Sequence, residues 1–122
     1  MIATAKPTRI CSPGPSESGL IQFSPSAPKN IPENKARIIF ANGNFWGRTL
    51  AAISSSDDPV SYKDFGPYMP GYDIIPYNDL ESLEVKLKNP HTAAFMVEPV
   101  QGEAGVIVPD EGYLTGVRPV SY

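Results

Sequence analysis

Apolar residues beyond residue 35 are grouped into short runs whose type changes along the chain. "ARIIFANG" (residues 36–43) is an apolar, β-branched run closed by Asn-Gly, which is typical of a strand that enters a turn. "GRTLAAISSS" (residues 47–56) has good helix formers with apolar positions at helical spacing, and it predicts a helix up to Asp57. "DDPVSYKDFGPYMPGY" (residues 57–72) is rich in proline and glycine and predicts a long ordered loop.

The second half of the organised region continues this alternation. "DIIPY" (residues 73–77) predicts a short strand, and "TAAFMVEPV" (residues 92–100) predicts a continuous apolar strand with a carboxylate at its end. Between them, "NDLESLEVKLKNP" (residues 78–90) predicts a helix that Asn78 or Asp79 caps and that Asn89-Pro90 ends. One apolar stripe runs along this helix: Leu80, Leu83 and Leu87. "GYLTGVR" (residues 112–118) predicts a last helix, which Pro119 ends.

The order strand, helix, strand, helix, strand, helix indicates parallel βαβ units in an α/β fold. "AAFMV" (residues 93–97) lacks polar alternation, as expected of a strand that is covered on both faces. Three strands with so few helices cannot cover both faces of such a sheet. We therefore expect residues 35–118 to be a slice of a larger α/β domain, followed by a truncated C-terminus at residues 119–122.

Residues 1–34 differ in texture, because they hold six prolines and seven serines or threonines and show no helical or strand period. Such a segment buries too little apolar surface to offset its ordering entropy, and we expect a disordered leader. Lys6 and Arg9 precede the first acidic residue, Glu17, as in a transit peptide, but the prolines disrupt an amphipathic helix.

Composition excludes several classes of protein. The chain has 122 residues, enough for one small domain, and its net charge of −3 gives no basic field for nucleic acid. No apolar run is long enough to span a bilayer. A single cysteine, Cys11, excludes an internal disulfide framework and fits a reducing compartment. The only histidine, His91, is expected in a solvated turn, and no Cys/His spacing predicts a metal site.

Two unusual clusters follow predicted strands, at Asn42–Arg48 and at Glu98–Gly105. Ligands of open α/β sheets bind outside the carboxyl ends of the strands, so we expect the two clusters to share a site. Phe45 and Trp46 are either core aromatics or a platform on which a planar ligand stacks. The glycines around them let the backbone approach a ligand closely.

Three charged residues in these clusters are candidate ligand contacts. Arg48 is either a surface ion-pair partner or, at a strand end, a two-donor fork for a carboxylate or phosphate. Glu98 closes a buried strand, where an unpaired carboxylate is costly, and therefore needs a donor or a cation. Glu103 lies on a glycine-flanked loop and is either a solvated acid or a carboxylate free to swing. "GEAG" is not a phosphate loop, because it lacks the Walker spacing and its lysine.

The segments "FANGNFWGRTLAAISSS", "FGPYMPGYDIIPYNDLESLE" and "AAFMVEPVQGEAGVIVPDEGYLTGVR" together resemble class III, fold-type-I pyridoxal-phosphate aminotransferases. The Phe-Trp pair and "GPYMPGYDIIPYND" resemble in particular the members that act on ornithine. The resemblance covers residues 35–118 and implies part of the large domain of that fold. It implies transfer of the δ-amino group of ornithine to 2-oxoglutarate, with pyridoxal 5'-phosphate as cofactor, which yields glutamate semialdehyde and glutamate.

The resemblance also implies a role for each candidate residue. Phe45 would stack on the pyridine ring of the cofactor, and Glu98 would support the cofactor and its pyridine-binding acid from behind. Arg48 would bind a substrate carboxylate. Glu103 would act as a gate, pairing with a second arginine when ornithine is bound and moving away for the dicarboxylate, so that one pocket accepts both.

The same comparison predicts what the chain does not supply. The family's phosphate-binding turn, pyridinium-binding Asp and Schiff-base lysine match no residue here, and the chain's lysines lie at other positions: Lys6, Lys29, Lys35, Lys63, Lys86 and Lys88. Transamination needs such a lysine, so we expect no catalytic residue here and an inactive partial chain. The alternatives are a module that docks on full-length subunits of this homo-oligomeric family, and a small-molecule binder without chemistry. The family occurs in the mitochondrial matrix and in the cytoplasm, and the leader does not decide between them.

Overall fold

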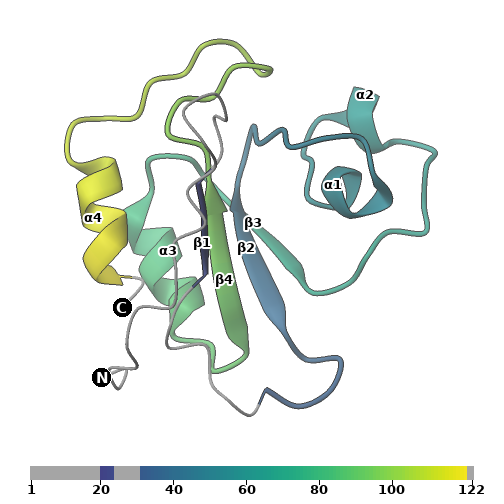
Figure 1. Cartoon of the computed structure of the whole chain (residues 1–122), viewed down its shortest axis with the longest axis horizontal. Coiled ribbons are helices and arrows are strands. Elements are labelled where there is room, and N and C mark those ends of the chain that lie inside the picture. The colour runs from purple at the N-terminus through teal and green to yellow at the C-terminus, as the bar shows by residue number, and fades with distance from the viewer. Residues whose placement is uncertain (1–19, 24–30, 121–122) are drawn as a thin grey trace.

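The structure is a computed structural model that describes residues 20–23 and 31–120. Four strands form one sheet in the order β1-β4-β2-β3, accompanied by four helices (Figure 1). In chain order the elements are β1 (Leu20–Phe23), β2 (Arg37–Ala41), α1 (Leu50–Ser54), α2 (Pro59–Tyr62), β3 (Tyr72–Ile75), α3 (Leu80–Leu87), β4 (Thr92–Val97) and α4 (Tyr113–Val120).

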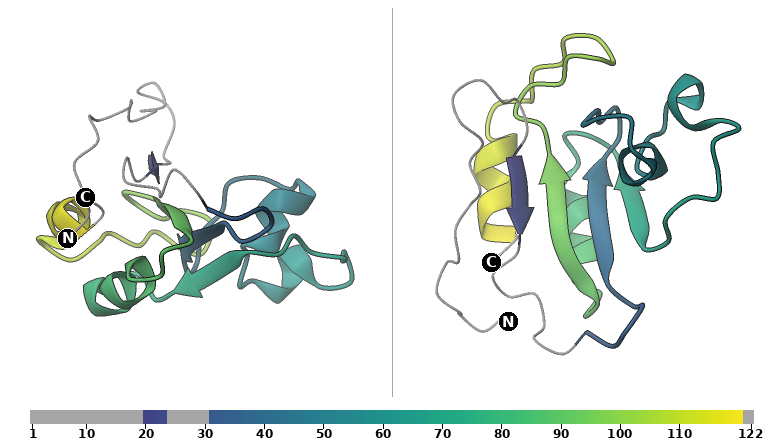
Figure 2. Two further views of the ribbon diagram at one scale, coloured as in Figure 1. Left: turned by 90° about the horizontal axis from the view of Figure 1, so that it is seen from below. Right: turned by 45° about the vertical axis from the view of Figure 1, so that its right-hand side comes forward.

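The three strands predicted from the sequence run parallel, with β2 between β3 and β4, which confirms the α/β prediction. Phe40 of β2 lies opposite Ile74 of β3 and Met96 of β4, so the three strands end at nearly the same level. Their arrows point the same way, and β1 points the opposite way (Figure 2). The loops that follow β2, β3 and β4 therefore leave the sheet at one edge.

The main core lies between one face of the sheet and helices α3 and α4. The strands contribute Ile39, Ala41, Ile75, Phe95 and Val97, and the helices contribute Leu83, Tyr113 and Val117. Burying each of the larger of these apolar side chains stabilises the fold by about 1.5–3 kcal/mol. Helix α3 begins as predicted, because the Asp79 side chain accepts from the Ser82 amide at 2.9 Å. The predicted apolar stripe is confirmed, with Leu83 buried and Leu80 and Leu87 packed against the core.

The opposite face of the sheet packs aromatic rings. Side chains alternate along a strand, so Phe40 points away from the α3 and α4 side. Its ring stacks on Trp46 at a centroid distance of 6.0 Å and meets Tyr72 at 4.8 Å. Phe95 and Met96 of β4 are both almost fully buried, which confirms that this strand is covered on both faces.

The structure corrects four details of the sequence prediction. Helix α1 ends at Ser54 and a second short helix, α2, lies within the stretch expected to be a loop. Asp58 caps α2 by accepting from the Val60 amide at 3.0 Å, and Pro59 occupies the first turn, where its missing N–H costs nothing. Helix α4 continues through Pro119 to Val120 instead of ending before the proline.

The fourth correction concerns the expected leader at residues 1–34. Its residues Leu20–Phe23 form β1, which pairs antiparallel with β4 in the register Leu20 opposite Val97. No local period predicts this strand, because its hydrogen bonds come from the edge of a strand more than 70 residues away. Residues 1–19 and 24–30 of the predicted leader, with Cys11 among them, lie outside the described residues.

Candidate functional site

The turn after β2 is fixed by a buried amide and a buried serine. Asn44 donates through Nδ2 to the carbonyl oxygens of Ala41 at 2.9 Å and Ser55 at 2.7 Å. Trp46 donates from Nε1 to the Ser55 hydroxyl at 2.7 Å, while its ring stacks on Phe40. Of the two rings considered as a ligand platform, Trp46 is therefore part of the scaffold.

The turn also contacts the loops that follow α1 and β4. Gly43 has φ +70°, and its amide donates to Asp57 Oδ1 at 2.8 Å. A Cβ at this position would lie 3.0 Å from Gln101 Oε1. Gln101 is almost fully buried and donates from Nε2 to the Asn42 carbonyl at 2.6 Å. The glycine is thus required both by the backbone conformation and by the close approach of Gln101.

Phe45 and Glu98 are joined directly, as the shared strand edge predicted. The Phe45 amide donates to Glu98 Oε1 at 2.6 Å. Glu98 is only 6% exposed, and burial raises the pKa of its carboxyl group, while the hydrogen bond from Phe45 opposes this rise. The sequence predicts that the buried carboxylate of Glu98 needs a donor, and the structure shows that this donor is the backbone amide of Phe45 in the Asn42–Arg48 cluster.

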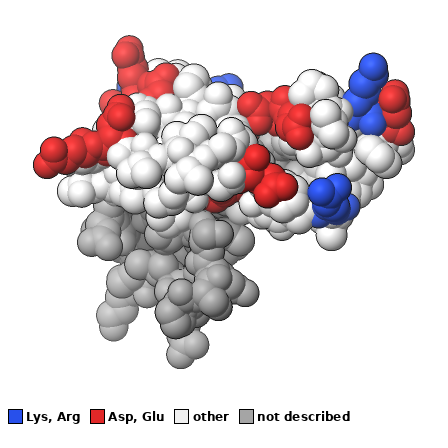
Figure 3. Space-filling model, turned by 90° about the horizontal axis from the view of Figure 1, so that it is seen from above, with Lys and Arg blue, Asp and Glu red and all other residues white. Residues whose placement is uncertain are grey.

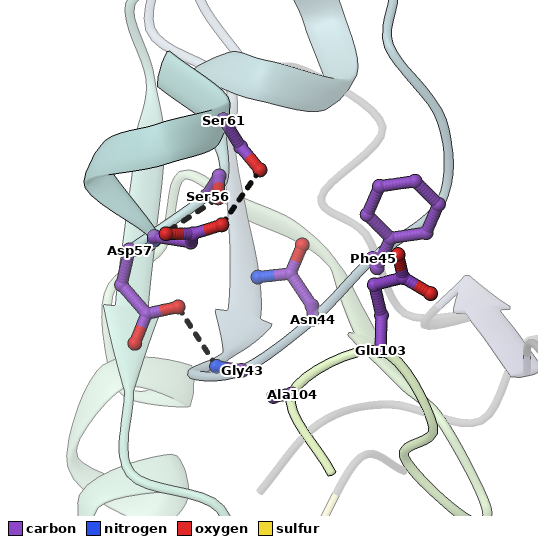
Figure 4. Close-up of a pocket in the computed structure, with 9 residues that line it drawn as sticks. Gly43, Asn44, Phe45, Ser56, Asp57, Ser61, Glu103 and Ala104 are labelled. Carbon is purple, nitrogen blue, oxygen red and sulfur yellow. Dashed lines mark hydrogen bonds between the residues drawn. The ribbon is translucent and has the colours of Figure 1, made fainter. Parts of the chain in front are cut away.

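A hollow of about 410 Å³ opens beside this pair, between the turn after β2, the start of α2 and the loop after β4. Phe45 from the turn after β2 and Glu103 from the loop after β4 both line it (Figure 4). Its complete lining is Gly43, Asn44, Phe45, Ser56, Asp57, Asp58, Ser61, Glu103 and Ala104. Viewed onto this edge of the sheet, the surface displays acidic side chains more prominently than basic ones (Figure 3).

Arg48 does not line this hollow. Its guanidinium carbon lies 5.9 Å from the centroid of the Phe45 ring, within the range of a cation–π contact. The side chain lines a second, smaller hollow of about 220 Å³ together with Ile53, Val60 and Phe65. Arg48 forms no ion pair with any residue that the structure describes. The structure therefore brings Phe45 and Glu98 into direct contact and places Glu103 in the same lining as Phe45, whereas Arg48 contacts the Phe45 ring but lines a different hollow.

Sequence reasoning missed the contribution of residues 56–61 to the hollow. The sequence places Ser56 at the end of the predicted helix and Asp57, Asp58 and Ser61 in the predicted ordered loop, without a role in the site, although they supply much of the lining. A signal was present, because Asp followed by Pro is a common start of a helix. Asn42 and Gln101 lie within the two predicted clusters, but their role in connecting the loops behind the hollow, and that of Tyr77, was not predicted.

Other candidates lie elsewhere or are not found. His91 occupies the turn before β4, at the opposite edge of the sheet, where its carbonyl accepts from the Arg37 amide at 2.9 Å. Within residues 20–23 and 31–120, no cluster of His, Cys, Asp and Glu could hold a metal ion. Among the same residues, no helix has the length and apolar character needed to cross a membrane.

Comparison with known proteins gives one consistent result. The chain is 70% identical over 90 residues to the mitochondrial ornithine aminotransferase of Rattus norvegicus, an alignment that covers 74% of this chain and 20% of the rat protein. It is 60% identical over 90 residues to the ornithine aminotransferase of Vigna aconitifolia, of which it covers 21%. The crystal structure of the Toxoplasma gondii ornithine aminotransferase superposes with a TM-score of 0.72 at 49% identity, over 74% of this chain and 21% of that one.

The chain thus spans about a fifth of the length of the curated relatives that it matches. The sequence profile of the aminotransferase class-III family matches residues 22–121, and so extends past both ends of the region 35–118 that carried the resemblance. Proteins of this family depend on pyridoxal phosphate. Because the profile matches most of the sequence, the chain belongs to the class III aminotransferase family.

Proposed function

We propose that this chain supplies one wall of the cofactor and substrate site of an ornithine aminotransferase. In that reaction the δ-amino group of ornithine is transferred to 2-oxoglutarate, giving glutamate semialdehyde and glutamate. The observation that carries the proposal is the meeting of Phe45, Glu98 and Glu103 at one sheet edge beside an open hollow. Identity of 55–70% to ornithine aminotransferases over this stretch supports the choice of substrate.

The lining of the hollow fits pyridoxal phosphate in part. The half-buried Phe45 ring borders open space, so it can stack on a planar pyridine ring. The charged groups of the lining are all carboxylates, those of Asp57, Asp58 and Glu103, and they would repel a phosphate. When bound, the cofactor supplies the electron sink for the amino-group transfer. The described residues would hold its ring, and its phosphate needs donors other than this lining.

Substrate binding is assigned to Arg48 and Glu103. Arg48 is exposed and has no carboxylate partner among the described residues, so it can take a substrate carboxylate with little loss of existing contacts. Glu103 is exposed at the rim of the hollow, where its negative charge favours a cationic amine. Arg48 contacts the Phe45 ring and Glu103 lines the hollow beside that ring, so the two charged groups can serve different parts of one amino-acid substrate.

We further propose that the 122 residues alone do not catalyse transamination. This part of the proposal is supported by the lining of the hollow, which includes none of the lysines of the described region, Lys35, Lys63, Lys86 and Lys88. Lys86 instead pairs with Asp73 at 3.2 Å and Lys88 with Glu84 at 3.5 Å. Under this proposal the chain contributes to binding, and the proton-carrying amine that the reaction needs comes from elsewhere.

Exposed apolar side chains favour a second candidate function, docking on full-length subunits of the same family. Val60 is 87% exposed and Phe65 62% exposed, and both border the smaller hollow beside Arg48. Large apolar side chains that gather on a surface are common at protein interfaces. Co-elution of the chain with a full-length ornithine aminotransferase during size-exclusion chromatography, lost on Phe65→Ser, would support this function.

The principal experiment is a titration of the full chain with pyridoxal phosphate. Binding is monitored by the quenching of the fluorescence of Trp46, the only tryptophan. We expect saturable, reversible quenching. Phe45→Leu should weaken the affinity for pyridoxal phosphate by roughly two- to tenfold, which corresponds to the loss of one ring stack. Phe65→Leu is the matched control, because it shortens an exposed ring outside the larger hollow. Equal effects of the two variants would refute the assignment of Phe45.

The catalytic part of the proposal has its own test. After incubation with the cofactor and reduction with borohydride, peptide mapping should find only scattered labelling of exposed lysines. A single labelled lysine, together with conversion of ornithine and 2-oxoglutarate, would show that the chain is a complete enzyme and would overturn this part.

A further inference from the structure

The loops that follow β2, β3 and β4 are joined by a closed series of hydrogen bonds. Asn42 Oδ1 accepts from the Tyr77 amide at 2.7 Å. The Tyr77 hydroxyl donates to the Glu98 carbonyl at 2.8 Å, with the Pro99 carbonyl at 3.4 Å. Glu98 Oε1 accepts from the Phe45 amide at 2.6 Å, and the peptide chain from Phe45 back to Asn42 closes the ring.

Tyr77 is the member of this ring that joins the loop after β3 to the loops after β2 and β4. It does not line the hollow, so it acts on a ligand only through its neighbours, and its hydroxyl reaches the hollow through Glu98 and Phe45. Its ring packs on Tyr113 at a centroid distance of 5.3 Å, which fixes the direction of its hydroxyl. Burial, and then the nearby charge of Glu98, raises the pKa of Tyr77, so the hydroxyl stays protonated and can donate at neutral pH.

We propose that Tyr77 is a positioning residue whose hydroxyl holds the Glu98 backbone, and through the Glu98 carboxylate the Phe45 amide, at the border of the hollow. The part of this proposal that concerns a ligand rests on the proposed function. The hydrogen-bonded ring itself does not, because it is made only of residues of this chain. Without the Tyr77 hydroxyl, the Glu98–Pro99 segment loses its tie to β3, and the Phe45 amide opens more often to solvent.

The neighbouring Tyr113 provides a matched control. Its hydroxyl is buried without a hydrogen-bond partner, and burial raises its pKa to about 12. The Asn78 amide partly offsets this rise without meeting the geometry of a hydrogen bond. Tyr113→Phe therefore removes a hydroxyl from the same pair of aromatic side chains and leaves every bond of the hydrogen-bonded ring in place. Tyr77→Phe removes one of these bonds.

The test is amide hydrogen exchange of the full chain, resolved by NMR at single residues. In Tyr77→Phe we expect the Phe45 amide to exchange roughly three- to tenfold faster, the loss associated with one hydrogen bond. The β2 and β4 amides should keep their rates, which separates loss of position from loss of stability. Tyr113→Phe should leave the Phe45 amide at the wild-type rate.

A second pair of variants tests another link of the hydrogen-bonded ring, the bond from the Tyr77 amide to Asn42. Asn42→Ala removes the acceptor for the Tyr77 amide and should also accelerate exchange at Phe45, whereas Asn42→Asp keeps an acceptor and should restore protection. An unchanged Phe45 rate in Tyr77→Phe would overturn the proposal. So would equal acceleration at Phe45 and at the β2 and β4 amides, or the same effect in Tyr113→Phe.

Titration with pyridoxal phosphate separates this inference from the proposed function. Weaker Trp46 quenching in Tyr77→Phe than in Tyr113→Phe supports both. If no variant shows quenching but the Phe45 amide exchanges faster in Tyr77→Phe, the positioning role of Tyr77 is supported and the proposed function is refuted. If Tyr77→Phe shows wild-type quenching and an unchanged exchange rate at the Phe45 amide, the positioning role of Tyr77 is refuted and the proposed function is unaffected.

Discussion

Replacing Gly43 by alanine tests how closely the turn after β2 is fitted to the loop after β4. The backbone of Gly43 has φ +70°, a conformation that costs an L-residue about 1–2 kcal/mol. The added Cβ would lie 3.0 Å from Gln101 Oε1 and 3.3 Å from its Nε2, so the Gln101 amide must move. Moving it weakens the 2.6 Å bond to the Asn42 carbonyl, worth about 0.5–1.5 kcal/mol. We expect a total loss of about 2–3 kcal/mol.

Two other glycines separate these contributions. Gly112 has φ +87° with no atom within 4 Å of an added Cβ, so Gly112→Ala should cost only the backbone term. Gly102→Ala introduces neither a close contact nor a positive φ and should be nearly neutral. Urea unfolding followed by Trp46 fluorescence and far-UV circular dichroism gives the three losses. If Gly43→Ala costs no more than Gly112→Ala, the Gln101 contact does not constrain the turn.

Two further predictions concern pH. The Arg37 side chain, through its hydrogen bonds, holds the pKa of Asp73 below its usual range, so the stability from Asp73 is present above pH of about 4 and is lost as the pH falls through the lowered pKa. Asp73→Asn should therefore lower the urea midpoint at pH 7, and this loss should shrink as the pH falls below about 4; a loss that stays constant down to the acid limit of folding would contradict this. Burial raises the pKa of Glu98, so wild-type stability falls as the pH rises from about 4.3 through the raised value. Glu98→Gln lacks this loss, and its stability relative to wild type should increase between pH 4 and pH 7, whereas a constant difference would refute the assignment.

The strands and the helix α3 could be predicted from sequence because their signals are local. Apolar runs mark β2 and β4, and Asp79 with the leucine stripe marks α3. β1 carries no such signal, since it depends on the open edge of β4 for its hydrogen bonds. A reading of local periods cannot detect a strand that forms by pairing with a distant partner.

The site could be predicted as a place but not in its detail. Parallel strands end at one edge, and this alone brings Phe45 and Glu98 together. Which of two adjacent rings faces the hollow depends on the bond between Trp46 and Ser55, a contact that spacing does not reveal. The direction of Arg48 likewise depends on the packing of its side chain over Phe45. The role of Tyr77 depends on its packing against Tyr113 and on a single hydroxyl, and neither has a sequence signature.

The three carboxylates around the hollow differ in what they are free to do, and this difference bears on substrate choice. Asp57 accepts from the Gly43 amide, and Asp58 accepts from the Val60 amide and the Ser61 hydroxyl, so both are committed to holding the fold. Glu103 is exposed and forms no hydrogen bond or ion pair with any residue that the structure describes. A site that binds a cationic amine and then a dicarboxylate must change its charge or move a charge. Of the three, only Glu103 can move without breaking a hydrogen bond that the structure shows, so under the proposed function we expect Glu103 to be the carboxylate of this lining that responds to a change of substrate.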